Sequence, residues 1–260
     1  MVTAGVWCTI RAVRILVTND DGIDSTGLHV LAQRLTEVGE VTVFAPSGEY
    51  SGAGAAIGHL GPGIPDVHRV ERPELSKVAV AYHMDSPPAL CSLLACKGLF
   101  GELPDIVVSG INPGWNVGHA AHFSGTIGAG ITASLFGIPA LAMSQPAGET
   151  QLWETAAEVA AGMVHDVLGR PRLLNVNVPN LASADLAGSK QTVMGDRFPY
   201  SLDAPSLSKK TEHSFAVSFT RDGTWDSFDG SDTEAVESGY VSVTELTPTH
   251  TAINSDKLAP

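Results

Sequence analysis

Two adjacent carboxylates near the N-terminus have the type and spacing of a cation site. Asp20 and Asp21 stand in the run Asn19-Asp20-Asp21-Gly22, directly after a short apolar segment. Hard divalent cations prefer oxygen ligands, and a bound cation relieves the repulsion between neighbouring carboxylates. The alternative is a plain turn followed by a helix cap, because Asn, Asp and Gly are common turn residues. This pair alone does not decide between the two interpretations.

Two later clusters have the residue types that bind anions. The segment 109–118 holds three glycines and the side chains of Asn112 and Asn116, so its backbone is able to approach a phosphate closely. The run Ser124-Gly125-Thr126 opens an uncharged stretch with helical character, and free N–H groups at a helix N-terminus attract anions. The alternatives are an ordinary Gly/Asn loop and simple N-capping by Ser124.

The three clusters together predict a metal-assisted phosphoryl site. Carboxylates, amides and a helix N-terminus are the groups that hold a cation and a phosphate. Other phosphoryl and acyl-transfer motifs are absent from the sequence: it has no GxxxxGK[ST], no dinucleotide GxGxxG and no GxSxG. Thr18 stands where an aspartyl-phosphate enzyme of the DxDxT type would carry its nucleophilic Asp, which argues against that mechanism.

The surrounding pattern predicts an α/β fold with a doubly wound, mostly parallel sheet. Strands alternate with helices, and ligands of such sheets gather at the carboxyl ends of the strands. Strands are expected at 14–18, 41–45, 78–84, 105–109, 138–143 and 173–179. Helices are expected over 28–35, 89–99 and 151–168, and a further buried helix lies in the uncharged stretch 123–148, which glycines and Pro139 make unsuitable as a membrane span. We expect one domain over 1–260, with a core at about 14–185 and a β-rich extension or arm at about 186–260.

Composition restricts the partners and the compartment. Among 260 residues, 15 Lys+Arg stand against 28 Asp+Glu, giving a formal net charge of −13. This balance argues against nucleic-acid and anionic-membrane binding, which use clustered Lys and Arg, but allows a small anionic substrate held by local groups. Three cysteines are too few for a disulfide framework, and no secretory signal is evident at the start. We therefore expect a cytoplasmic protein.

The three clusters resemble the SurE family of metal-dependent 5′-nucleotidases and phosphatases. The similarity is strongest over about residues 14–145. It includes Val43-Phe44-Ala45-Pro46 followed by Ser51-Gly52, and it continues in 174–179 and in Gly239-Tyr240-Val241-Ser242-Val243-Thr244. The resemblance implies a Rossmann-like core and a homodimer or homotetramer that exchanges its C-terminal arm.

The resemblance also implies site residues. It implies one divalent metal ion per subunit, Mg²⁺ or Mn²⁺, held by Asp20, Asp21, Ser51 and Asn112. It implies phosphate contacts from Asn116, Ser124, Gly125 and Thr126, with Asp20, Asp21 and Asn116 as the catalytic set. Ser51 has no signal apart from the resemblance.

Several positions depart from the family pattern. Ser47 and Tyr50 replace the usual Asp and Gln, the run Asp85-Ser86-Pro87-Pro88-Ala89-Leu90 replaces Gly-Thr-Pro-Ala-Asp-Cys, and Glu245 replaces Pro. These stretches are expected on the leaving-group side, so they permit a specialised substrate.

The resulting hypothesis is hydrolysis of nucleoside 5′-monophosphates by metal-activated water. The alternatives are a phosphatase for a specialised biosynthetic intermediate and a non-catalytic phosphometabolite-binding protein. His119 and His122 are candidates for the general acid or base, although loop histidines are more commonly solvent-facing. Tyr50 and Trp115 are candidates for stacking on a base, the alternative being simple packing.

Overall fold

A nine-stranded sheet organises the part of the chain that the structure describes. The computed structural model describes residues 11–58, 60–195, 206–218 and 227–247. The strand order is β3-β4-β2-β1-β5-β6-β7-β11-β8. The strands are β1 (Arg14–Thr18), β2 (Glu40–Pro46), β3 (His68–Val70), β4 (Val80–Met84), β5 (Ile106–Pro113), β6 (Ala140–Gln145), β7 (Leu173–Asn177), β8 (Ser189–Thr192) and β11 (Val241–Leu246).

The centre of the sheet is parallel, as the sequence predicts. β4, β2, β1, β5, β6 and β7 run in one direction, so their carboxyl ends share one edge. β3 pairs antiparallel with β4, and β11 pairs antiparallel with β7. Every residue of β6 and β7 is buried, which is typical of strands covered by helices on both faces.

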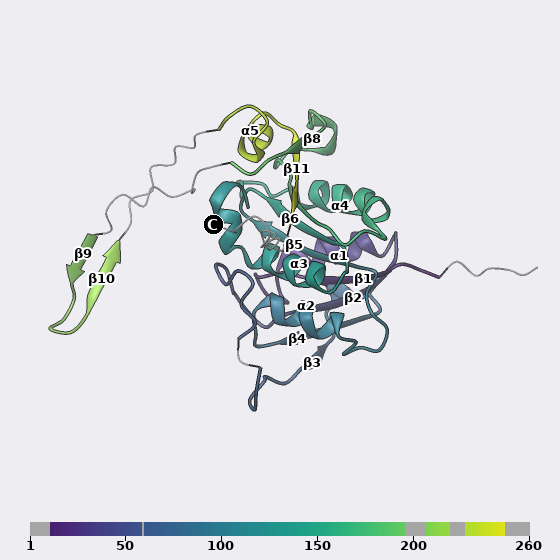
Figure 1. Ribbon diagram of the computed structural model, residues 1–260, viewed down its shortest axis with the longest axis horizontal. Coiled ribbons are helices and arrows are strands. Elements are labelled where there is room, and N and C mark those ends of the chain that lie inside the picture. The colour runs from purple at the N-terminus through teal and green to yellow at the C-terminus, as the bar shows by residue number, and fades with distance from the viewer. Residues whose placement is uncertain (1–10, 59, 196–205, 219–226, 248–260) are drawn as a thin grey trace, which may run out of the picture.

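Helices cover both faces of the sheet (Figure 1). They are α1 (Thr26–Leu35), α2 (Pro88–Cys96), α3 (Gly125–Leu135), α4 (Trp153–Val167) and α5 (Asp232–Glu237), with short 3₁₀ turns η1 (Pro73–Leu75), η2 (Gly118–Phe123) and η3 (Ser183–Asp185). Leu28, Leu31 and Leu35 of α1 join α4 in one core cluster, while α2 and α3 supply a second cluster on the opposite face. The doubly wound α/β architecture is confirmed.

Two predicted boundaries are wrong for local reasons. The strand expected at 105–109 continues to Pro113, because Gly110 adopts a φ of +137° at a register irregularity against β6 and the chain then resumes pairing. A side chain at Gly110 would meet the main-chain oxygen of Met143. The helix expected over 89–99 ends at Cys96, because Gly98 takes a φ of +85° just beyond it.

The uncharged stretch forms α3 and β6, the buried helix and strand expected there. Over the described ranges, no helix combines the length and apolar character needed to cross a membrane.

The C-terminal region both extends the sheet and forms a separate hairpin. β9 (Ser206–Lys209) and β10 (Phe215–Ser218) pair antiparallel, and the hairpin stands away from the body of the molecule in Figure 1. β8 and β11 instead join the main sheet next to β7. Antiparallel pairing after residue 186 is thus confirmed, while the division into a core and an extension of one domain stays a prediction. Phe219, expected in the hairpin, lies outside the described residues.

Candidate active site

A cavity opens where β1 and β5 end side by side. These strands pair in parallel with Thr18 opposite Ser109, so the loops that follow them lie at one edge of the sheet. The cavity has a volume of about 750 Å³. Its lining includes these sequence-predicted residues: Asp20, Asp21, Ser51, Asn112, Asn116 and Ser124. The parallel topology therefore brings the three predicted clusters together.

The turn after β1 is built by Asn19, which leaves the two carboxylates for other contacts. Asn19 Oδ1 accepts a hydrogen bond from the N–H of Gly22, and its Nδ2 donates to the oxygen of the same residue. Gly22 has a φ of +98°, and a Cβ there would lie 2.9 Å from the Cα of Gly48. The turn alternative is thus correct for Asn19 and Gly22, and it is compatible with a cation site at Asp20 and Asp21.

Asp20 is locked against the start of α3. Its side chain is buried, and Thr126 Oγ1 donates to Asp20 Oδ1 at 2.5 Å. A Cβ on Gly125 would lie 2.7 Å from the Cβ of Asp20, so only glycine fits beside this carboxylate. Burial raises the pKa of Asp20, and the Thr126 hydroxyl opposes that rise by stabilising the charged form. Thr126 was expected to contact phosphate, but its hydroxyl serves Asp20.

The Asp21 carboxylate has the features of a cation ligand. Its Oδ2 is buried and has no hydrogen-bond partner among the described residues. Burial, followed by the nearby charges of Asp20 and Glu49, raises its pKa to about 7. A cation close to this oxygen would supply the missing interaction and favour the ionised form. The donor set therefore fits a hard divalent metal.

The other two expected metal ligands offer oxygen atoms at the same cavity. Ser51 is exposed on the glycine-rich loop and lines the cavity. Asn112 donates from Nδ2 to the oxygen of Gly114 at 2.9 Å, which leaves its amide oxygen as the atom for a cation. In the described part of the chain, no three His, Cys, Asp or Glu side chains are grouped so that they could hold a metal. The expected set contains only two such residues, so its chemistry is that of an oxygen-ligand site.

Asn116 is held by a polar clamp within the sheet. Its N–H donates to Asn177 Oδ1 at 2.9 Å, and its main-chain oxygen accepts from Asn175 Nδ2 at 2.7 Å and from Asn177 Nδ2 at 3.1 Å. Its own side-chain Nδ2 donates to Ser144 Oγ at 2.8 Å. Sequence reasoning missed these partners, although two asparagines inside the apolar run 173–178 are the signal that could have found them. The clamp holds residues 114–118, which we call the anion loop, at the cavity.

The start of α3 faces the cavity through Ser124. Its Oγ accepts from the N–H of Ile127 at 3.2 Å, so the N-cap alternative is correct. The first N–H groups of any helix lack partners within the helix, so the anion contacts expected from Gly125 and Thr126 stay a prediction. A side chain at Gly128 would meet the oxygen of Gly54, because the glycine-rich loop packs directly on α3.

The two candidate proton donors lie beside the cavity. His119 and His122 are exposed on η2, and their ring centroids are 6.3 Å apart. Neither belongs to the cavity lining, whereas their neighbours Ala120 and Phe123 do. Their role as acid or base stays a prediction.

The positions that depart from the family pattern contact one another. The Tyr50 hydroxyl donates to Asp85 Oδ1 at 2.7 Å, and Ser47 Oγ donates to the same atom at 3.5 Å. Burial and the neighbouring Asp85 raise the pKa of Tyr50 to about 12. Trp115 lines the cavity, whereas Tyr50 does not. The acidic Glu49, which sequence reasoning did not single out, also lines the cavity. The stacking hypothesis is therefore consistent with the position of Trp115 and not with that of Tyr50.

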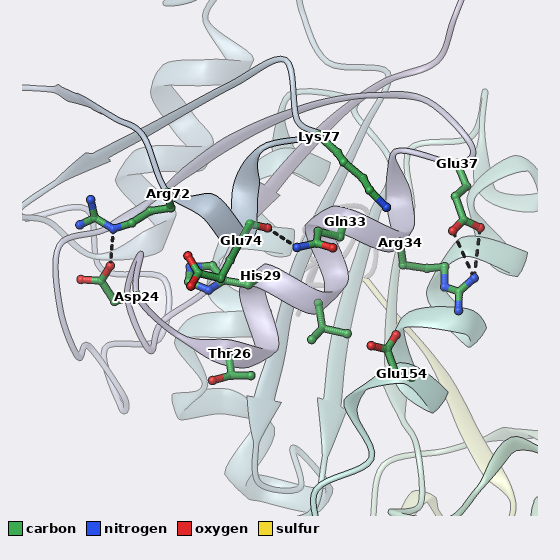
Figure 2. Close-up of a pocket in the computed structure, with 11 residues that line it drawn as sticks. Asp24, Thr26, His29, Gln33, Arg34, Glu37, Arg72, Glu74, Lys77 and Glu154 are labelled. Carbon is green, nitrogen blue, oxygen red and sulfur yellow. Dashed lines mark hydrogen bonds and ion pairs between the residues drawn. The ribbon is translucent and has the colours of Figure 1, made fainter.

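A second hollow of about 670 Å³ lies over α1, η1 and the start of α4 (Figure 2). Its arginines are engaged with carboxylates: Arg72 contacts Asp24 at 2.8 Å, and Arg34 contacts Glu37 at 3.1 Å. None of the sequence-predicted site residues lines it. The sequence-predicted residues therefore gather at the other cavity, at the carboxyl ends of the strands.

Known proteins with similar sequences and folds cover most of this chain. The family model for survival protein SurE matches residues 15–200. A 5′-nucleotidase SurE of Methylobacillus flagellatus is 34% identical over 238 residues, covering 90% of this chain and 92% of that protein. One of Geobacter sulfurreducens is 37% identical over 239 residues, covering 90% and 87%. The crystal structure of the SurE protein from Aquifex aeolicus is 30% identical with a TM-score of 0.76, covering 94% of this chain and 97% of that one.

Proposed function

This chain belongs to the survival protein SurE family and is a phosphoric monoester hydrolase, and we propose that it hydrolyses nucleoside 5′-monophosphates with one divalent metal ion per subunit. The observation that carries the proposal is the buried Oδ2 of Asp21, which has no hydrogen-bond partner in the described part of the chain and lies beside the carboxylate of Asp20. Both side chains line one cavity with Ser124, at the N-terminus of α3. A cation and a phosphate would thus find complementary charges within the same cavity.

The metal would be held by Asp20, Asp21, Ser51 and Asn112. When bound, Mg²⁺ or Mn²⁺ supplies a Lewis acid for a phosphate oxygen and lowers the pKa of water. Thr126 orients Asp20 through its hydroxyl, so the first ligand is preorganised before any metal binds.

Other groups of the protein would stabilise charge on the phosphate, orient it and protonate the leaving group. The N–H groups of Gly125 and Thr126 would stabilise negative charge on the phosphate oxygens. Asn116, clamped between β6 and β7, would orient the phosphoryl group. His119 or His122 would protonate the leaving alkoxide, because each adjoins a residue of the cavity lining.

A second candidate substrate class is a specialised phosphorylated intermediate. Glu49 places a carboxylate in the cavity lining, beside Asp20 and Asp21. Carboxylates accept hydrogen bonds from hydroxyl and amino groups, so this side favours a sugar or amine leaving group over a second anion. A non-catalytic phosphometabolite-binding role would give tight binding without phosphate release.

The assembly and compartment complete the proposal. Leu207, Phe215 and Val217 are exposed on the β9–β10 hairpin, where Leu207 pairs directly with Val217. We propose that a second copy of the chain covers this apolar face, giving a homodimer or homotetramer with exchanged arms.

Cys91 and Cys96 are buried free thiols, and burial raises their pKa values to about 12 and about 11. Such unreactive thiols fit the reducing cytoplasm, which is the compartment we propose.

Phosphate release tests the function directly. We expect release from nucleoside monophosphates with Mg²⁺ or Mn²⁺ and none with chelator. A panel that also contains sugar phosphates and an aryl phosphate separates the two substrate classes. No release from any compound, together with tight binding of one of them, would contradict hydrolysis and favour the binding role.

A further inference from the structure

Asp232 lies buried where the hairpin arm leaves the body of the molecule. It is the first residue of α5 and is 0% exposed. We call residues 193–195 and 230–232 the arm stems, because the chain between them carries β9 and β10. The stems are bonded to each other: the N–H of Val193 donates to the oxygen of Gly230 at 3.1 Å, and the N–H of Asp232 donates to the oxygen of Val193 at 2.9 Å.

The Asp232 carboxylate joins both stems to the anion loop. Its Oδ2 accepts from the N–H of Gly118 at 2.9 Å, across 114 residues of sequence. Its Oδ1 accepts from the N–H of Gly195 at 2.9 Å, and from the N–H of Thr233 at 2.8 Å. Gly195 has no room for a side chain without crowding this carboxylate, since a Cβ would lie 3.2 Å from Oδ1.

Gly118 is the first residue of η2 and stands two positions after Asn116. Gly118 adopts a φ of +51°, so the chain reverses sharply at this point between Asn116 and the histidine-bearing η2. The clamp from β6 and β7 holds the first half of this loop, and Asp232 holds the second half. Hydrogen bonds to an ionised carboxylate are the stronger kind, and burial strengthens them further.

We propose that Asp232 is a positioning residue for the anion loop. Through Asp232, the position of this loop depends on the position of the arm stems. The inference rests on the proposed function, because it concerns the loop that carries Asn116. One side chain receives N–H groups from an arm stem and from the loop, so displacement of the stem is transmitted to Gly118. The site would then respond to the arm's attachment, although the arm supplies none of the cavity's lining residues that the structure describes.

Asp232→Asn should remove the hydrogen bond to Gly118 and keep the hydrogen bonds to Gly195 and Thr233. The amide has one accepting oxygen, and the Oδ1 side presents the N–H groups of Gly195 and Thr233. We expect the oxygen to remain there and the amide NH₂ to face the N–H of Gly118, which replaces a hydrogen bond by a contact between two donors. The arm stems stay joined while the loop is released.

The experiment combines turnover with hydrogen exchange in the full-length protein. We expect kcat for nucleoside monophosphates to fall by about 10²-fold, the order reported for a shift of about 1 Å in reacting groups. Mn²⁺ affinity and oligomeric state should stay at wild-type values, and the Gly118 amide should exchange faster. The matched control is Ser231→Ala, which removes the equally buried N-cap of α5 but leaves the bond to Gly118. It should lower Tm without changing kcat.

Three results would overturn the proposal. They are wild-type kcat in Asp232→Asn, an equal loss of kcat in Ser231→Ala, and unchanged Gly118 exchange in Asp232→Asn. If the variant does not fold, hydrogen exchange in the wild type decides: the amides of Gly118 and Gly195 should open together, and independent opening refutes the link.

A wild type without any phosphate release would refute hydrolysis alone. Binding of inorganic phosphate with Mn²⁺ then tests Asp232, with weaker binding in Asp232→Asn as support and equal binding as refutation.

Discussion

Asp21→Asn should stabilise the metal-free protein while removing its response to metal. The pKa of Asp21 is raised from its usual 3.8 to about 7, chiefly by burial and then by the charges of Asp20 and Glu49. A carboxyl group whose pKa is raised by folding favours the folded state only while protonated. Stability from this group is therefore complete below about pH 4 and is lost progressively as the pH rises to about 7.

The expected magnitude follows from the two pKa values. At 1.36 kcal/mol for each pH unit, the raised pKa of Asp21 costs the folded state, relative to the unfolded chain, about 2 kcal/mol at pH 5 and about 4 kcal/mol at pH 8. The amide of Asn is neutral at both values, so the stabilisation of Asp21→Asn relative to wild type should grow between them. Urea unfolding with chelator, at pH 5 and pH 8, measures this difference.

Metal should offset much of this difference. A ligand present at 100 times its Kd stabilises the folded state by about 2.7 kcal/mol. We expect Mn²⁺ to stabilise the wild type at pH 8 and to leave Asp21→Asn unchanged. The matched control is Asp24→Asn in the same loop, because Arg72 lowers the pKa of that exposed carboxyl. An equal pH dependence of wild type and Asp21→Asn, or equal stabilisation by Mn²⁺, would refute the reasoning.

Four further predictions concern the site and the hairpin. Asp20→Asn should abolish metal-dependent phosphate release, and near-normal turnover would contradict its role as a metal ligand. Thr126→Val removes the donor to buried Asp20 and should cost about 1.5–3 kcal/mol of stability in urea unfolding, whereas a loss below about 0.5 kcal/mol would show that the bond contributes little. Gly125→Ala should displace the Asp20 carboxylate and lower Mn²⁺ affinity, as isothermal titration would show, and unchanged affinity would mean that the site adapts. Leu207→Asp places a charge opposite Val217 on the hairpin and should dissociate the oligomer in light-scattering measurements, while its replacement by Met serves as the control.

The sequence predicted which side chains lie near one another where parallel topology alone does the positioning. Asp20 and Asp21 follow β1, Asn112 lies near the end of β5, and parallel pairing of these strands brings them to one edge. Ser51 was found only through the resemblance, because a serine in a glycine-rich loop carries no periodic signal. Its place in the cavity depends on the packing of that loop against α3.

Contacts distant in sequence were beyond the reach of pattern reasoning. Asn175 and Asn177 stand in a strand that is wholly buried, so alternation does not show which loop they hold. Thr126 was expected at the phosphate, but whether its hydroxyl points to a ligand or to Asp20 depends on the approach of α3 to β1. Asp232 meets Gly118 across 114 residues, and only the completed fold brings them together. Local spacing thus predicts which edge of the sheet acts, and tertiary packing decides how each side chain is used.

The bonded stems make the hairpin an insertion with its two ends already joined. Val193 and Ser231 form a parallel bridge, so the chain leaves and re-enters the body at one point. The entropy of closing such a loop grows only slowly with its length. Evolution or a protein engineer is therefore free to lengthen, shorten or exchange this segment without altering the pairing of β8 with β11. A short Gly-Ser connection in its place should yield a monomeric body that keeps the nine-stranded sheet, and it would offer a compact scaffold for grafting other oligomerisation modules.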